Sequence, residues 1–248
     1  MSQTIDAFVA QLADVRTVGA DGSPQDLYGL VDRLTAHFAT TVGSVACRDG
    51  CITCCSSELP AVSSLEWRVI YRHLLTLPAE TREGVRQMAE LLRPLQPAMA
   101  HHRSLKLAQS DQLGRTPALQ CPFLLNGGCS IYAARPLICR GYGYTGATLG
   151  EQTGFFGCSL ASAHISAVAP KGLDLPLFDP YQAKLQALND AEGPSTWAYL
   201  AQWLWAHLDG DGFVAEAIWA PDFAVASAPR AVPAPRRLPP NPRLRRGR

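Results

Sequence analysis

The sequence contains no long run of apolar residues. No stretch approaches the roughly 18 uninterrupted apolar residues that a membrane helix requires, because even the tryptophan-rich TWAYLAQWLWAHL is short and broken by polar residues. The N-terminal MSQTIDAFVAQLADVR also lacks the basic residues and the apolar core of a secretory signal peptide. We therefore expect a cytoplasmic protein with no membrane partner.

The body of the chain also lacks an excess of basic charge. The formal net charge is +1, but the last segment, Ala228–Arg248, holds seven arginines, six prolines and no acid. The rest of the chain has 15 basic and 21 acidic residues, so it offers no long-range attraction for nucleic acid, and we expect no nucleic-acid partner. The proline-rich tail should be extended and disordered. We expect a solvated terminus, and the alternative is that its charge contacts an acidic protein partner or nucleic acid.

Helical periodicity is strong on both sides of the middle of the chain, whereas no series of alternating apolar residues predicts a sheet. Ser23 is expected to cap a helix that has Pro24 at its first position. Ser63 and Glu66 have the spacing of a capping box, which opens another helix. The remaining predicted helices cover residues 4–17, residues 78–95 with interruptions at Pro94 and Pro97, residues 181–189 and residues 195–208.

The stretch from about residue 109 to residue 179 is rich in glycine, proline and cysteine and has little periodicity. Metal ligands can hold such a region where a hydrophobic core cannot. The predicted fold is mostly α, with helices flanking a cysteine-rich irregular metal-binding lobe. Its expected parts are N-terminal helices (1–46), a cysteine-cluster metal-binding region (47–160), C-terminal helices that pack on it (161–227) and a disordered Pro/Arg-rich tail (228–248).

The eight cysteines fall into two blocks, CRDGCITCC and the later segments CPFLLNGGCSIYAARPLICRGYGY and FFGCS. Two cysteines separated by two residues, such as Cys51 and Cys54, can reach one metal, because the intervening turn brings both sulfurs to the same side. A reducing cytosol argues against disulfides. The candidate metal ligands are Cys47, Cys51, Cys54, Cys55, Cys121, Cys129, Cys139 and Cys158.

The cysteine spacing favours iron over zinc. Structural zinc takes four ligands, often as two CxxC pairs, whereas iron-sulfur clusters accept irregular spacing. The second block has gaps of seven and nine residues between its first three cysteines, which departs from the paired pattern. An iron-sulfur cluster or iron is therefore the favoured cofactor, and zinc is the alternative. Eight thiols could serve two four-ligand sites or one polynuclear site.

The segments CRDGCITCC, CPFL and GGCSIYAARPLICRGY, followed by a later cysteine, resemble the YkgJ-type cysteine-cluster family, which is described as a zinc- or iron-chelating domain. The resemblance covers roughly Cys47 to Cys158 and implies binding of a metal or an iron-sulfur cluster. The family's first block is CxxCxxCC, whereas the first gap here is three residues, so Cys47 departs from the pattern. A flagellin lysine methylase has a similar cysteine block, but nothing else in this chain supports a methylase activity.

Two arginines flank Cys139 in the second block. Arg135 and Arg140 could donate hydrogen bonds to sulfur or neutralise a thiolate-rich cluster. The alternative is that they are surface arginines or helix-end caps.

Other motifs have less support. The first block contains CxxxCxxC, the spacing of radical S-adenosylmethionine enzymes, but helices flank it and Cys55 would crowd the open iron. The segment GYGYTG matches GxGxxG without a preceding apolar strand. The six histidines are dispersed outside the cysteine blocks, and no GxSxG motif of a serine hydrolase is present.

The leading functional hypothesis is a metal-cluster protein with a redox or cluster-assisted role. The alternatives are a zinc-stabilised interaction module without catalysis and a metal-trafficking protein. No general base, nucleophile or substrate pocket can be named from the sequence, so no reaction is assigned.

Overall fold

The computed structural model describes residues 4–20, 22–43, 52–56, 59–96, 120–169, 173–210 and 212–223. Within these ranges helices predominate, which confirms the mostly-α class. No helix of the described ranges is both long enough and apolar enough to cross a bilayer. The predicted tail at 228–248 lies outside these residues.

The described ranges contain eight α-helices and two short 3₁₀ turns. The α-helices are α1 (Ile5–Gln11), α2 (Leu27–Val42), α3 (Ser64–Thr76), α4 (Ala79–Leu92), α7 (Leu137–Gly141), α8 (Ser159–Val168), α9 (Asp179–Glu192) and α10 (Leu200–Ala206). The 3₁₀ turns are η1 (Arg93–Leu95) and η3 (Tyr132–Ala134).

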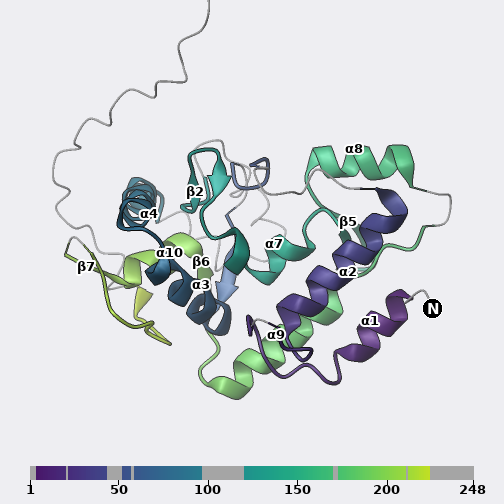
Figure 1. The fold of residues 1–248 in the computed structure, drawn as a ribbon, viewed down its shortest axis with the longest axis horizontal. Coiled ribbons are helices and arrows are strands. Elements are labelled where there is room, and N and C mark those ends of the chain that lie inside the picture. The colour runs from purple at the N-terminus through teal and green to yellow at the C-terminus, as the bar shows by residue number, and fades with distance from the viewer. Residues whose placement is uncertain are drawn as a thin grey trace, which may run out of the picture.

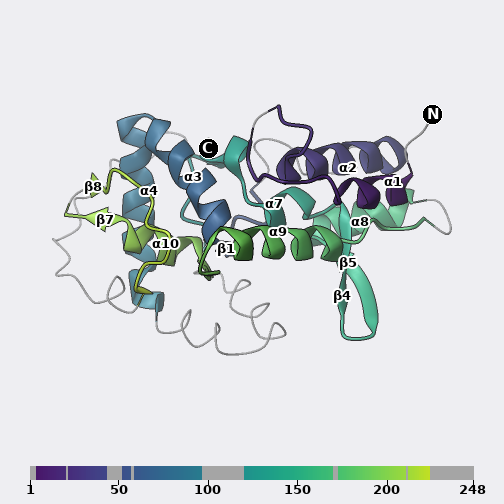
Figure 2. The ribbon, with the colours of Figure 1, turned by 90° about the horizontal axis from the view of Figure 1, so that it is seen from below.

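The strands form four two-stranded antiparallel sheets, β1–β6, β2–β3, β4–β5 and β7–β8. Their bounds are β1 (Ala61–Ser63), β2 (Leu124–Leu125), β3 (Gly128–Cys129), β4 (Thr145–Leu149), β5 (Gln152–Phe156), β6 (Trp197–Tyr199), β7 (Leu208–Asp209) and β8 (Gly212–Phe213). The β4–β5 hairpin projects from the body of the molecule (Figure 2). None of these sheets was predicted, because strands of two to five residues are too short to show an alternating pattern.

Helix starts depend on which side chain reaches the free amides of the first turn. At α3 the capping box is confirmed, since Ser63 and Glu66 each accept a hydrogen bond from the other's backbone amide. The predicted cap of α2 is wrong. Asp26 caps that helix in place of Ser23, because its carboxylate accepts from the amides of both Gly29 and Ala20 and so also fixes the preceding turn.

The helix predicted over 195–208 begins only at Leu200, because residues 197–199 form strand β6 against β1. The backbone groups of these residues find their partners in β1, and the indole of Trp203 donates to the carbonyl oxygen of Val62 at 3.2 Å. The stretch predicted to be irregular is also more regular than expected within 120–169, where two hairpins, α7 and α8 form.

Two hydrophobic cores lie at opposite ends of the molecule (Figure 1). The first is built on α3, α4 and α10 and includes the fully buried Trp67, Trp203 and Trp205. The second is built on α1, α2 and α9. Helix α7 lies between the two groups of helices in both views (Figures 1 and 2). The residues before β2 belong to the first core and Leu137 of α7 to the second, so the second cysteine block spans the junction.

Candidate metal centre

The β2–β3 hairpin fixes two thiols of the second block. Cys129 pairs with Leu124 in register, and the turn between the strands has positive φ at Asn126 and Gly127. Cys121 lies just before the hairpin, is 5% exposed and belongs to the first core. The tight turn returns the chain on itself, so that Cys129 lies beside the strand that follows Cys121.

The first cysteine block reaches this hairpin directly. The amide of Cys121 donates to the carbonyl oxygen of Cys55 at 2.8 Å. The Cys55 thiol hydrogen-bonds to Cys129 and to the neighbouring Cys54. Segments separated by 65 residues of sequence therefore place their sulfurs together. Cys47 lies outside the described residues, as does Cys51.

Cys139 is carried by a different element, helix α7. The first amide of that helix, at Leu137, donates to the carboxylate of Glu66 at 2.7 Å. Glu66 is 1% exposed and also accepts from the Tyr28 hydroxyl at 3.3 Å. Burial raises the pKa of Glu66, while the hydrogen bonds from Leu137, Ser63 and Tyr28 oppose that rise. This one carboxylate joins α2, α3 and α7 and sets the position of Cys139.

The thiols affect one another electrostatically. The hydrogen bond with Cys129 is the main cause that raises the pKa of Cys55, and the same bond lowers the pKa of Cys129. Burial raises the pKa of Cys121 to about 12. Burial, followed by the charges of Cys54, Cys121 and Cys129, raises the pKa of Cys139 well above its ordinary value. Several thiolates can exist together in this place only if a cation compensates their charge.

Cys55, Cys121 and Cys129 pack together at the first core, and Cys54 and Cys139 act on them electrostatically. They are free cysteines, without disulfides. Among the described residues, no three His, Cys, Asp or Glu side chains already stand in the arrangement of a metal site. A gathering of thiols fits a thiophilic metal, whose binding would replace the S–H protons and draw the sulfurs closer.

Cys158 has different surroundings. Its sulfur accepts from the amide of Ala161 at 3.5 Å and so caps α8. It packs in a third apolar cluster, around Phe38, Val42 and Ile165. The structure thus packs Cys55, Cys121 and Cys129 at the first core and places Cys158 in another cluster.

The two arginines beside Cys139 have separate roles. Arg140 is buried, pairs with Asp32 and donates to the carbonyl oxygens of Ala133 at 2.6 Å and Arg135 at 2.9 Å. Its guanidinium also lies over the Tyr28 ring at 4.2 Å. Arg140 therefore ties the turn before α7 to α2. Arg135 lies over the Tyr132 ring at 4.2 Å, with its Nη2 3.6 Å from Oδ1 of Asp32; its charge adds to the hydrogen bond with Cys55 in lowering the pKa of Cys129 and opposes the rise in the pKa of Cys139.

Sequence reasoning missed Glu66 and Asp32 as supports of this site. Glu66 was recognised only as the acidic residue of a capping box, and nothing in its spacing indicates the contacts to Tyr28 and Leu137, which are far away in sequence. Asp32 lies on a predicted helix, but its two arginine partners are far away in sequence. Arg140 lies 108 positions further along the chain, and Arg135 lies shortly before Arg140. No sequence signal of the chain could have identified these contacts.

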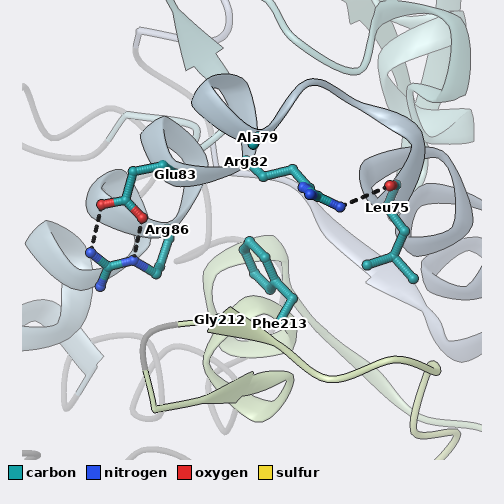
Figure 3. Close-up of a pocket in the computed structure, with 7 residues that line it drawn as sticks. All are labelled: Leu75, Ala79, Arg82, Glu83, Arg86, Gly212 and Phe213. Atoms are coloured by element: carbon teal, nitrogen blue, oxygen red, sulfur yellow. Dashed lines mark hydrogen bonds and ion pairs between the residues drawn. The ribbon is translucent and has the colours of Figure 1, made fainter.

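A pocket of about 320 Å³ lies elsewhere, between α4 and β8 (Figure 3). Its charged groups already have partners: Arg86 pairs with Glu83 at 2.7 Å, and Arg82 donates to the carbonyl oxygen of Leu75 at 3.0 Å. Phe213 forms an apolar wall, and no cysteine lines the pocket. The pocket offers neither a nucleophile nor a metal ligand set, so the thiol cluster is the better candidate site.

Residues 46–157 match the model of the CxxCxxCC family, described as a putative zinc- or iron-chelating domain. The match confirms the resemblance found in the cysteine spacing, and it supports metal binding without selecting the metal. It ends one residue before Cys158. A comparison with curated proteins found no match to the chain, and neither did a comparison with solved structures.

Proposed function

We propose that the CxxCxxCC domain of this chain, residues 46–157, holds an iron-sulfur or other iron cluster with a redox or cluster-assisted role. The observation that carries the proposal is the meeting of thiols from three separate segments. These segments are the first block, the β2–β3 hairpin and α7. The proposed ligands are Cys54, Cys55, Cys121, Cys129 and Cys139, with Cys47 and Cys51 added on their spacing alone.

The number of thiols favours a polynuclear centre over a single zinc ion. A structural zinc ion is satisfied by four ligands, whereas five thiols of the described residues shift one another's pKa values. Clusters of iron accept thiolates at irregular spacing, because several metal atoms offer coordination positions.

The chain's own residues supply position and surroundings. Glu66 fixes the start of α7, and the β2–β3 hairpin fixes Cys121 and Cys129. The first core covers one side of the cluster with apolar side chains, which limits the access of water. When bound, an iron cluster would supply one-electron transfer or Lewis acidity, and hydrogen bonds and burial would tune it.

Anaerobic purification of the full chain, followed by iron, zinc and labile-sulfide analysis and an absorption spectrum, tests this proposal. We expect iron with sulfide and a coloured protein. A colourless protein with stoichiometric zinc and no sulfide would contradict the iron proposal and favour the second candidate.

That second candidate is a zinc-stabilised module without catalysis. It is favoured by the packing of Cys121 and Phe123 within the first core, with Cys55 and Cys129 against it. A metal here would tie the hairpin to the helices and contribute to folding. In that case a chelator should lower the melting temperature strongly, and the protein should show no redox signal at any potential tested.

A further inference from the structure

A second pocket, of about 820 Å³, lies between α2 and α3. The loop before α2 and residues of η3 and α7 complete its lining, and none of the described lining residues is a cysteine. Small-molecule sites have volumes of roughly 300–1,000 Å³, so this pocket is far larger than a single inorganic ion requires. It can hold an organic molecule, at a place distinct from the thiols.

Two arginines of this lining have no carboxylate partner among the described residues. They are Arg33 on α2 and Arg72 on α3, and both are exposed. Arg33 donates to the side-chain oxygen of Gln11 at 3.4 Å. Arg72 donates through its Nε to the carbonyl oxygen of Arg68 at 3.3 Å. Both acceptors are uncharged, so the two guanidinium groups keep their full positive charge and further N–H donors.

The two acids of the lining are already compensated. Asp26 is 4% exposed, and its two carboxylate oxygens accept from backbone amides. Asp32 pairs with Arg140 through one oxygen, and its other oxygen is 3.6 Å from Nη2 of Arg135. These carboxylates therefore leave the charges of the other two lining arginines unbalanced.

The loop before α2 leaves part of its backbone open to a ligand. Gly22 lines the pocket, is exposed and has a φ of 77°, and nothing lies within 4 Å of the place that a Cβ atom would occupy. A ligand can approach this backbone closely, because glycine has no side chain. Turns that expose backbone N–H groups and guanidinium groups that face the same space are both typical of oxyanion sites.

We propose that this pocket binds a small organic molecule with two or more negative charges, carried by phosphate or carboxylate groups. Arg33 and Arg72 hold the oxyanions, since the planar guanidinium matches either group with two parallel N–H donors. The site needs no metal and so goes beyond the proposed function. Arg140 lines the pocket and follows Cys139 in α7, so the ligand lies against the helix that carries one proposed metal ligand.

Isothermal titration calorimetry of the full chain in a low-salt buffer tests the proposal. The probes are fructose bisphosphate, which carries two phosphates, and succinate, which carries two carboxylates, with glucose as the neutral control. We expect one or both anions to bind at one site per chain and glucose not to bind. Binding of only one anion identifies the preferred oxyanion.

Arg33→Met and Arg72→Met should each weaken the binding of that anion about tenfold or more, the effect of removing charge-assisted hydrogen bonds. The matched control is Lys184→Met, which removes one positive charge from α9, outside the pocket, and should change the affinity less than twofold. Circular dichroism checks that each variant folds. If one arginine variant does not fold, the other decides, because the two arginines are on different helices.

The proposal is wrong if neither anion binds to wild type at millimolar concentration. It is also wrong if both arginine variants bind as tightly as wild type, because the anion then binds elsewhere on the chain. Either result leaves the proposed function standing, since that proposal depends on the iron and sulfide content of the protein. Anion binding by a protein that contains no iron would support the pocket and contradict the cluster.

Discussion

The backbone amide of Leu137 donates to the carboxylate of Glu66 across 71 positions of sequence, at 2.7 Å. Leu137 begins the helix that carries Cys139, and Glu66 is the third residue of helix α3 and completes the capping box that begins it. The Glu66 carboxylate therefore connects the starts of α3 and α7 and anchors the helix that carries Cys139.

Replacing Glu66 should affect both stability and the metal. Glu66→Ala leaves the amides of Leu137 and Ser63 without their acceptor, and we expect a loss of about 3 kcal/mol in the free energy of unfolding. Metal content should fall as well, because α7 loses its anchor. Urea unfolding and metal analysis check both effects. Glu151→Ala, at an exposed position in the turn between β4 and β5, is the control and should change neither.

The buried His207 should make the folding stability of the protein depend on pH. Its Nδ1 is 2.7 Å from the carbonyl oxygen of Trp203, and its Nε2 accepts from the Trp67 indole at 3.1 Å and the Ile218 amide at 2.8 Å. The buried ring is therefore neutral, and burial lowers its pKa to about 4. In the unfolded chain the pKa is about 6.5, so acid protonates the unfolded state first.

The stability that depends on neutral His207 is complete above about pH 6.5 and is lost as the pH falls toward 4. We expect a loss of about 2 kcal/mol between pH 7.5 and pH 5, measured by urea unfolding. His207→Gln should be less stable at both values and show a smaller difference between them. An equal difference in wild type and variant would assign the pH dependence to other groups.

Cys129 and Cys158 should respond differently to replacement by serine. Cys129→Ser removes a sulfur from the centre of the cluster, and we expect the metal content to fall by more than half. Cys158→Ser should keep its metal, because serine is itself a favourable helix cap and can take over the bond from Ala161. Metal analysis of both purified variants decides the point, and a metal-free Cys158→Ser protein would return Cys158 to the ligand set.

Gly141 should not accept a side chain. Replacing a glycine within a helix by alanine ordinarily stabilises the helix. Here, however, a Cβ atom would lie 2.6 Å from Cδ2 of the buried Phe178. We expect Gly141→Ala to destabilise the protein by about 2 kcal/mol through overpacking. The matched control is Gly154→Ala, where nothing lies within 4 Å of the added Cβ atom. Thermal unfolding compares the two variants, and a Gly141→Ala protein as stable as the Gly154→Ala protein would contradict the packing argument.

Local signals in the sequence gave good predictions where the structure is local. The capping box at Ser63 and Glu66 is such a case, since its partners are three residues apart. The start of α2 was missed because Ser23 and Asp26 are both good caps, and the choice between them depends on the turn that Asp26 also closes at Ala20. Strand β6 was missed because its partner β1 is far away in the sequence.

The sequence by itself determined that this is a mostly helical protein with two cysteine blocks, the first of them close to the CxxCxxCC pattern, because helical periodicity and short cysteine spacings are properties of neighbouring residues. Only the tertiary structure decided which thiols meet. Cys55 lies against Cys129 because the Cys121 amide donates to the Cys55 carbonyl oxygen and the hairpin turns back after it. Cys139 joins them because Glu66 holds α7, while Cys158 caps a separate helix. Contacts between distant segments depend on burial and hydrogen bonding in the folded chain, which no spacing in the sequence records.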